Sequence, residues 1–279
     1  MQDRQTFAAA NRGNSKANLS PSAVSVDNVN LWYGAFHAIT QISFEIKQGQ
    51  FAAIVGPTGS GKSSLLNLVA GLLPATAGEV RTNNQVVNGV NSSCGYMFQA
   101  DALLPWRSAI DNVMLGPILA GAHKADARSR AMDWLARVGL RGFEGRYPHH
   151  LSGGQRKRVS MAQVLINEPQ ILLMDEPFGS LDAQTRALMG QELLDLWAEL
   201  RPTVLFVTHD LEEAIALADR ILLVKSGPDA TLKGDYPVNL ERPRSVTDAR
   251  FMTGFSEVYE VVWQGLKEEV MVTYERNKG

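Results

Sequence analysis

The chain has 279 residues, of which 45% are hydrophobic and 20% charged, a composition typical of a folded globular protein and not of a disordered one. Its formal net charge of -2 at pH 7 provides no overall attraction to nucleic acid or to an anionic membrane, so no nucleic-acid partner is expected. Cys94 is the one cysteine, which excludes an internal disulfide and favours a reducing compartment.

The apolar runs and the N-terminal segment bear on membrane association. The longest apolar runs, such as 171–174 and 221–224, have the length of strands, whereas a spanning helix needs about 20 residues. Residues 1–22 are polar and lack the apolar core of a secretion signal, and they are predicted to form a disordered tail. Any role at a membrane is therefore expected to depend on a membrane-embedded partner.

The segment after this tail has the pattern of strands, a loop and a helix. Strands are expected over 24–32, 42–46 and 51–55, where β-forming residues gather. The third strand ends at Gly56, and apolar residues at helical spacing predict a helix over 62–72. A strand, a glycine loop and a helix in this order form the setting that a phosphate-binding loop requires.

The middle of the chain, about 101–165, has Ala-rich helical segments broken by Gly139 and Gly142. It is predicted to be a helical subdomain inserted into an α/β domain. Beyond it, strands are expected over 171–174, 203–207 and 221–224, separated by helices over 183–200 and 211–219. This alternation predicts a largely parallel sheet.

An amphipathic helix is predicted near the C-terminus, from about 246 to 269. Its apolar stripe includes Phe251, Phe255, Val262 and Leu266. Such a stripe packs against its own domain or binds a partner, and the sequence leaves both interpretations open.

The loop before the helix at 62 matches the pattern G-x-x-x-x-G-K-[ST]. Its residues are Gly56, Pro57, Thr58, Gly59, Ser60, Gly61, Lys62 and Ser63, followed by Ser64. The glycines allow backbone N–H groups to face inward, where they and the helix N-terminus bind phosphate oxygens. Lys62 adds a charge for the outer phosphates, and the Ser63 hydroxyl suits Mg²⁺. This motif predicts ATP binding.

Two carboxylates follow the apolar strand at 171–174. Asp175 stands at its carboxyl end, the edge at which ligands bind in sheets of this kind, and suits Mg²⁺ through water. Glu176 is placed to orient or deprotonate an attacking water molecule. The pair predicts hydrolysis of the bound ATP.

A second anion-binding surface is predicted at Ser152, Gly153, Gly154 and Gln155, which with Leu151 spell LSGGQ at the start of a helix. Because the chain already has one phosphate loop, this second anion-binding surface would serve a nucleotide that another copy of the chain holds. With these motifs in this order, over roughly 24–226, the sequence resembles the ATP-binding-cassette (ABC) ATPases.

The resemblance implies roles for further residues. Tyr33 is the expected adenine-stacking residue, Gln99 corresponds to the glutamine loop, Asp182 to the loop that crosses the dimer, and His209 to the switch histidine. Glu176, His209 and Gln99 are then catalytic, while Ser63, Gln99 and Asp175 hold Mg²⁺. Ser152 and Gly154 of one copy close over the ATP of another, which implies a head-to-tail homodimer or a pair with a homologous cassette.

The implied fold class is α/β: a P-loop NTPase core of ABC type with a mostly parallel central sheet, an N-terminal antiparallel β-subdomain and an inserted α-helical subdomain. The expected division is a tail at 1–22, an ATPase domain at 23–250 that contains the helical subdomain at about 101–165, and a C-terminal helical extension at 251–279.

The stretch from Leu104 to Arg107, together with 178–182 and 241–244, is similar to the cassettes of nitrate, sulfonate and taurine importers. That likeness implies a peripheral subunit on the cytoplasmic face of the inner membrane. Its partners would be an integral-membrane permease, contacted near Gln99–Trp106, and indirectly an extracytoplasmic solute-binding protein. Burial of Trp106 in the helical subdomain is the alternative for that residue.

The sequence departs from the family at Ser180, where alanine is more usual, at His150, where glutamine is common, and at Gln163, where arginine is usual. The last departure affects local charge pairing. A soluble ABC ATPase without a permease is the alternative function, and a P-loop phosphotransferase is a third, for which LSGGQ has no obvious use.

Overall fold

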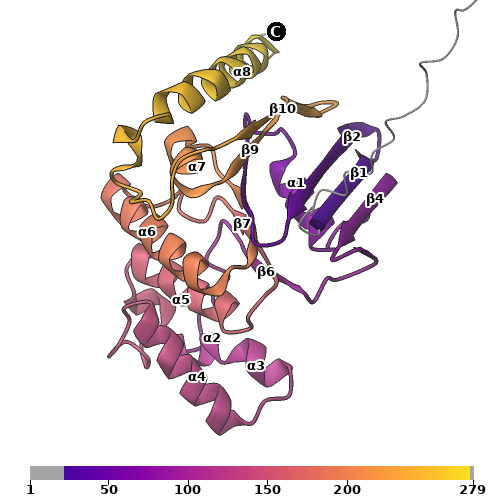
Figure 1. The fold of residues 1–279 in the computed structure, drawn as a ribbon. Helices are drawn as coiled ribbons and strands as arrows, with labels where there is room; N and C mark the ends of the chain where they lie inside the picture. The colour runs from indigo at the N-terminus through magenta and orange to yellow at the C-terminus, as the bar shows by residue number, and fades with distance from the viewer. Residues whose placement is uncertain (1–21, 277–279) are drawn as a thin grey trace, which may run out of the picture.

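A computed structural model describes residues 22–276, which contain two β-sheets and two groups of helices (Figure 1). The first sheet has four antiparallel strands in the order β2-β1-β4-β5. Their bounds are Ser22–Tyr33 for β1, Phe36–Lys47 for β2, Ala77–Thr82 for β4 and Gln85–Val86 for β5. This sheet is the predicted antiparallel β-subdomain.

The second sheet has six strands in the order β10-β9-β3-β8-β7-β6. Their bounds are Leu232–Pro237 for β10, Arg220–Val224 for β9, Phe51–Val55 for β3, Thr203–Val207 for β8, Ile171–Asp175 for β7 and Cys94–Met97 for β6. Only β10 runs antiparallel to its neighbour in this sheet. The prediction of a mostly parallel central sheet is therefore confirmed.

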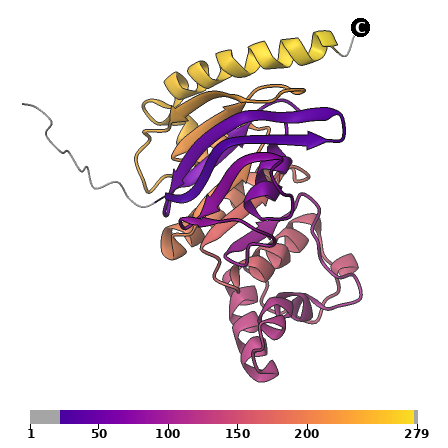
Figure 2. The same ribbon diagram turned by 90° about the vertical axis from the view of Figure 1, so that its right-hand side faces the viewer.

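Helices cover the six-stranded sheet and form the inserted subdomain, which extends away from the sheets in both views (Figures 1 and 2). Their bounds are Lys62–Val69 for α1, Ala109–Val113 for α2, Leu115–Leu119 for α3, Lys124–Arg137 for α4, Gly153–Leu165 for α5, Ala183–Leu200 for α6, Leu211–Leu217 for α7 and Phe255–Arg276 for α8. Short 3-10 turns occupy Pro148–His150 and Ala249–Phe251.

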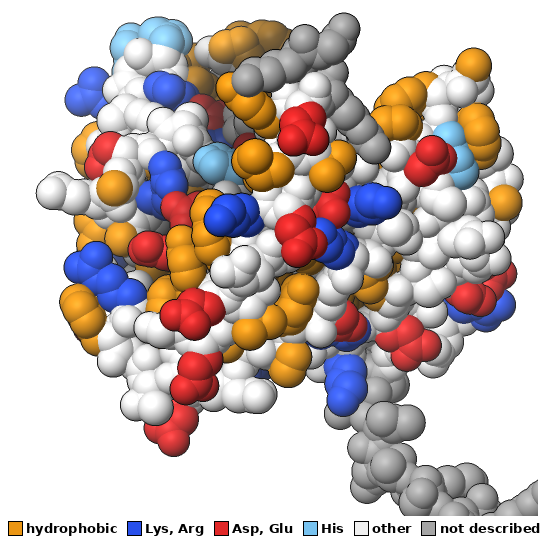
Figure 3. Space-filling view, turned by 90° about the horizontal axis from the view of Figure 1, so that it is seen from above, with side chains coloured by type: hydrophobic (Ala, Val, Ile, Leu, Met, Phe, Trp, Pro, Cys, Tyr) orange, Lys and Arg blue, Asp and Glu red, His pale blue; other side chains and the backbone are white. Residues whose placement is uncertain are grey.

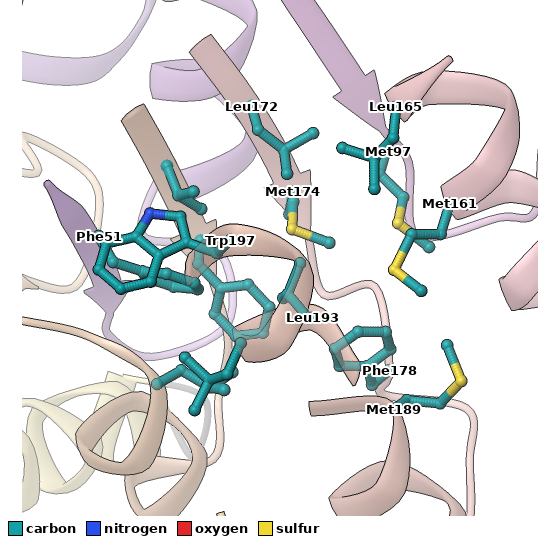
Figure 4. Close-up of a cluster of buried hydrophobic side chains, with 14 of the residues drawn as sticks. Phe51, Met97, Met161, Leu165, Leu172, Met174, Phe178, Met189, Leu193 and Trp197 are labelled. Atoms are coloured by element: carbon teal, nitrogen blue, oxygen red, sulfur yellow. The ribbon is translucent and has the colours of Figure 1, made fainter. Parts of the chain in front are cut away.

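Two apolar clusters lie on the two faces of the six-stranded sheet. One joins that sheet to α1 and the antiparallel sheet, through residues such as Ile54 and Leu66. The other joins it to α5, α6, α7 and the inserted helices, and includes Phe51, Met174 and Trp197 (Figure 4). Strands buried on both faces read as continuous apolar runs, which is why β3, β7 and β8 were predictable from the sequence.

The main wrong prediction concerns the helix expected from 246 to 269. Residues 246–254 contain only the 3-10 turn Ala249–Phe251, and α8 begins at Phe255 and runs to Arg276. Gly254 has a φ of 90°, a left-handed conformation that ends a regular helix, and the Phe251 side chain counted in the stripe is 75% exposed. The helix predicted over 62–72 also ends early, before Gly71, whose φ is 67°.

The helix predicted to end at 219 stops at Leu217, since Ala218 has an extended backbone with φ -93° and ψ 156°, and Arg244 binds carbonyl groups at this end. The buried Arg244 guanidinium donates to Ala216 O over 2.7 Å and also to Ala218 O. Burial lowers the pKa of Arg244 to about 10, so the group remains charged at neutral pH. A cation at a helix C-terminus also interacts favourably with the helix dipole.

The tail and domain boundaries stay predictions, since 1–21 and 277–279 lie outside the described residues and Ser22 already belongs to β1. Within 22–276, no helix is long and apolar enough to span a membrane. Cys94 lies in β6, where burial raises the pKa of its thiol to about 12.

Helix α8 packs on its own domain, which agrees with the first of the two interpretations of its apolar stripe. Val262 and Leu266 are buried against the main cluster, and Glu269 accepts hydrogen bonds from Ser226 N at 2.9 Å and Ser226 Oγ at 3.0 Å. Lys233 Nζ lies 2.8 Å from the other Glu269 oxygen. The outer face carries exposed apolar side chains such as Val261 and Met271 among charged ones (Figure 3).

Glu269→Ala is expected to lower the free energy of unfolding by about 2 kcal/mol, because it leaves the buried Ser226 N–H without its acceptor. Glu268→Ala is the matched control: Glu268 also pairs with Lys233, at 2.7 Å, but its side chain is 71% exposed, so a change below about 0.5 kcal/mol is expected. Urea denaturation of both variants measures the difference, and equal effects would contradict the docking role of Glu269.

Candidate active site

Four parallel strands deliver the predicted site residues to one edge of the six-stranded sheet. Gly56 follows β3, Gln99 lies two residues after β6, Asp175 ends β7, and His209 lies two residues after β8. The strands pair in a register that aligns their ends, with Met97 opposite Met174 and Asp175 opposite Val207. Carboxyl ends of neighbouring parallel strands share one edge, so residues far apart in sequence meet there.

The glycine loop curls tightly between β3 and α1. A Cβ at Gly56 would lie 2.5 Å from Val224 O, so only glycine fits this close approach. Gly61, with a φ of 80°, is the left-handed N-cap of α1. Ser60 Oγ is buried with no hydrogen-bond partner in the described part of the chain. The loop therefore combines free backbone donors with a buried hydroxyl, a combination that fits bound phosphate.

Lys62 folds back over this loop. Its buried side chain donates from Nζ to Gly56 O at 2.9 Å and to Pro57 O at 2.8 Å. Burial lowers the pKa of Lys62, while the carboxylates of Glu176 and Asp175 act in the opposite direction. The ammonium group thus stands on the phosphate loop facing the acidic pair.

Asp175 lies where the loop and β7 meet. Burial raises its pKa, a hydrogen bond from the Ser63 hydroxyl and the charge of Lys62 lower it, and Glu176 raises it. A hydroxyl and a carboxylate oxygen are ligands that Mg²⁺ accepts, and this ion commonly keeps several waters and binds substrate phosphates. Across residues 22–276 no group of three or more His, Cys, Asp or Glu side chains could hold a metal alone, so phosphate and water would complete such a site.

One oxygen of Glu176 brings the three predicted catalytic residues together. Glu176 Oε2 accepts from Gln99 Nε2 at 3.4 Å and lies 3.3 Å from His209 Nδ1. Glu176 has a φ of 43°, which is unusual for a residue other than glycine, and its N–H donates to Val207 O at 2.9 Å. The His209 side chain is 56% exposed, so it can reach a ligand on the open side.

Tyr33, the residue expected to stack on adenine, stands beside the start of α1. Its hydroxyl lies 3.1 Å from Ser64 Oγ, and the side chain is half exposed. Trp32, next to it, stacks on His37 with ring centroids 4.0 Å apart. The aromatic face of Tyr33 is thus held close to the phosphate loop.

The LSGGQ segment and Asp182 lie apart from the phosphate loop of the same chain. Ser152 caps α5 in a capping box with Gln155, and Asp182 caps α6 by accepting from Thr185 N at 3.0 Å. A Cβ at Gly154 would lie 3.1 Å from Thr185 Cγ2, so the two caps are neighbours. No hydrogen bond or ion pair of the described residues joins them to 56–64.

The sequence did not predict the charged cluster that holds Gln99. Lys157, fully buried in α5, donates to Gln99 O at 2.6 Å and lies 3.1 Å from Asp101 Oδ1. Arg156 pairs with the other Asp101 oxygen at 2.9 Å. The only available signal was a run of three basic residues, Arg156 to Arg158, in the first turns of this helix.

A second unpredicted cluster surrounds His209. Thr208 Oγ1 donates to Glu213 Oε2, and Asp210 N donates to Thr208 Oγ1 at 3.0 Å. Arg186 Nη1 donates to Asp210 Oδ2 at 2.9 Å. Burial raises the pKa of Glu213 to about 7. These residues fix the backbone on both sides of His209.

Of the three departures from the family pattern, Gln163 has a visible consequence. It lines a cavity of about 720 Å³ together with Arg130 and Asn167, at the outer edge of β6. Arg130 pairs there with Glu168 at 3.5 Å. His150 is exposed on the turn before α5, and nothing in the structure gives Ser180 a separate role.

Known proteins share this architecture and sequence. Residues 39–179 match the family model described as ABC transporter. The aliphatic sulfonates import ATP-binding protein SsuB of Albidiferax ferrireducens is 45% identical over 219 residues, which cover 78% of this chain and 76% of the relative. The taurine import ATP-binding protein TauB of Yersinia pestis is 44% identical over 200 residues, or 71% of this chain and 78% of that protein.

A solved structure is similar over most of the chain. The dimeric ATP-binding cassette MJ0796, in a post-hydrolysis state bound to ADP and Pi, has a TM-score of 0.69 and 33% identity, and the match covers 77% of this chain and 99% of that one. The chain belongs to the ABC transporter family. It is an ATP-binding ATPase subunit, which confirms the resemblance and the fold class inferred from the sequence.

Glu213→Gln is expected to make stability less dependent on pH. In the folded chain the Glu213 pKa is about 7, against an ordinary 4.5, so the folded state binds the proton more tightly and wild-type stability falls as pH rises from 4.5 through 7. The stability of the variant relative to wild type should therefore increase by about 2 kcal/mol between pH 5.5 and pH 8.

Denaturation at the two pH values measures this difference. Residues near the Glu213 carboxyl are Thr208, Asp210, Arg186 and Glu176, and none of them changes in the variant. Glu212→Gln, at the exposed neighbouring position, is the control. An equal gain at pH 5.5 and pH 8 would show that ionisation of Glu213 is not the cause.

Proposed function

We propose that this chain hydrolyses ATP with Mg²⁺ to drive an importer for a small solute, as a head-to-tail dimer on a membrane permease. The observation that carries the proposal is the convergence of Gln99 and His209 on Glu176 Oε2, opposite Lys62. An ATPase needs this combination of a base for water, a sensor of the outer phosphate and a cation for developing charge.

The residues have distinct parts in the reaction. The loop from Gly56 to Ser63 binds the phosphates through backbone N–H groups and Lys62, while Tyr33 stacks on adenine. Glu176 takes the proton of the water whose oxygen bonds to the γ-phosphorus as the bond to the bridging oxygen breaks, which yields ADP and Pi. His209 contacts the γ-phosphate. Mg²⁺, held by Ser63, Asp175 and the Gln99 amide oxygen, would neutralise phosphate charge.

The dimer follows from the separation of the two anion-binding surfaces. Ser152, Gly153, Gly154 and Gln155 make no hydrogen bond or ion pair with the phosphate loop among the described residues, although the first turn of a helix such as α5 has backbone N–H groups without partners inside the helix. A second copy turned head to tail would place them on its nucleotide, with Asp182 beside them. The dimeric state of the solved cassette similar to this chain supports the arrangement.

Glu176→Gln is expected to bind ATP within a few-fold of wild type, because a neutral amide still fits beside Gln99 and His209. Hydrolysis should fall by about a hundredfold or more, since the amide cannot accept the proton from water. The variant should accumulate as a dimer in size-exclusion chromatography with ATP and Mg²⁺.

Glu257→Gln, exposed in the first turn of α8, is the control and should hydrolyse ATP normally. Because permease contacts can support dimerisation, the measurement is repeated on the membrane complex. A Glu176→Gln chain that stays monomeric in both settings would count against the shared site.

An importer is the form of transporter that the relatives favour. SsuB and TauB are both import ATP-binding proteins, and this argues against a soluble ATPase without a permease. By analogy, the chain sits on the cytoplasmic face of the membrane and serves a permease that receives a sulfonate-like or related solute from an extracytoplasmic binding protein. Solute choice lies with those partners.

The permease surface is proposed beside Gln99, where aromatic side chains are exposed. Trp106 is 71% exposed, so its alternative placement in the core is wrong, and Phe98 is 42% exposed and stacks on Tyr96 at 4.2 Å. Tyr96 also lines the cavity of about 720 Å³ at the edge of β6. Exposed aromatic side chains at Phe98 and Trp106, on the segment that follows β6, favour a partner contact there.

Trp106→Ala is expected to reduce co-purification with a multi-span permease at least severalfold, since exposed aromatic anchors contribute strongly to interfaces. ATP binding and thermal stability of the isolated chain should stay near wild type. Phe251→Ala, at a 75% exposed aromatic residue far from this surface in sequence, is the control. Equal retention of the permease by both variants would place its contact elsewhere.

A further inference from the structure

Arg186 connects two loops of the active site that are distant in sequence. From the first turns of α6, its Nη2 donates to Leu181 O at 3.1 Å, in the loop that precedes Asp182. Its Nη1 donates to Asp210 Oδ2 at 2.9 Å, next to His209. One planar guanidinium thus spans both loops, because its N–H donors point in fixed, divergent directions.

Both ends of this bridge lie in hydrogen-bonded structure. Asp210 caps α7 by accepting from Glu213 N at 3.1 Å and donates its own N–H to Thr208 Oγ1. At the other end, Leu181 N donates to Phe178 O at 3.1 Å. A displacement of either loop therefore changes the geometry at Arg186.

The two loops also approach each other at the reacting carboxylate. A Cβ at Gly179 would lie 3.6 Å from His209 Cε1 and 3.7 Å from Glu176 Oε2. The loop from Gly179 to Asp182 and the loop around His209 are thus neighbours on the same side of Glu176. Arg186 is the charged group behind them that binds to both.

Two buried polar atoms at the Arg186 bridge lack hydrogen-bond partners. Arg186 Nε and Glu213 Oε1 are both buried and have no hydrogen-bond partner among residues 22–276. An unpaired buried donor and acceptor favour a rearrangement that pairs them. The adjoining cavity of about 610 Å³, which Arg186, Asp210 and Glu213 all line, leaves space for such a movement.

We propose that Arg186 is a positioning residue that couples the placement of the 179–182 loop to that of His209. Contact of the loop with a second copy would then change the position of the histidine through the Arg186–Asp210 pair. The inference rests on the proposed shared site, because that site gives the 179–182 loop its contact with another subunit. Arg186 itself touches no substrate.

Hydrogen–deuterium exchange of the full chain tests the coupling directly. Asp210→Asn keeps a good helix cap but places an amide where Arg186 needs a carboxylate. Although Asp210 makes no hydrogen bond to the 179–182 loop, the coupling predicts at least threefold faster exchange of the Gly179 and Leu181 amides, which donate to Glu176 O and Phe178 O. Unchanged exchange there would overturn the proposal.

Steady-state ATP hydrolysis gives the second measurement, with Arg186→Gln, Asp210→Asn and the double variant. Each single variant should lower kcat by about tenfold with little change in KM, and the double variant should be no worse than Arg186→Gln. Arg137→Gln, which breaks an ion pair with Glu199 away from the site, should have neither effect. Multiplicative losses in the double variant, or losses that track melting temperature, would overturn the coupling.

The two proposals fail in different ways. A wild-type chain that hydrolyses ATP without cooperativity and never dimerises would refute the shared site, while the exchange result would still decide the link between the loops. A cooperative wild type with unchanged exchange in Asp210→Asn would refute the link alone.

Discussion

A buried lysine facing two carboxylates is the interaction on which the rest of the site depends. Lys62 is desolvated on the phosphate loop, and Asp175 and Glu176 favour its charged form. Two features of the fold maintain this arrangement. The β3-β8-β7 pairing brings the strand ends together, and the close approach of Gly56 to β9 fixes the loop. Charges that attract at short range in a low dielectric require such fixed geometry.

The inserted helices contribute to the same site through α5. Its Lys157 binds the carbonyl of Gln99 and the carboxylate of Asp101, and Asp101 in turn accepts from Arg156. Further along, Asn112 accepts from Leu104 N at 2.8 Å and so secures the segment that leads to Trp106. A partner bound at Trp106 would therefore press on a segment whose other end holds Gln99 against Glu176. Packed, hydrogen-bonded elements transmit small displacements in this way.

Short motifs made most of the site predictable from sequence, because each depends on local chemistry: glycines for a curled loop, and acids after a buried strand. The clusters around Lys157 and Arg186 were not predictable, since their partners come from distant segments. Among the strands, β4, β5, β6 and β10 were missed. The stripe that included Phe251 led to a helix that Gly254 prevents. The spacing of apolar residues shows which face of a helix would be buried, but it does not show whether the backbone can stay helical along the whole segment.

Under the proposed shared site, the caps of α5 and α6 indicate why one chain would bind ATP but need another to complete the site. Ser152 accepts from Gln155 N and donates its own N–H to Gln155 Oε1, and Asp182 accepts from Thr185 N, so what the start of α5 offers a second copy is mainly the N–H groups of Gly153 and Gly154 and the Ser152 hydroxyl proton. These are donors suited to phosphate oxygens. Under the proposed arrangement, ATP supplies the acceptors that the two surfaces lack. The subunits then close only while the γ-phosphate is present, so hydrolysis reopens them and passes the free-energy difference to the permease.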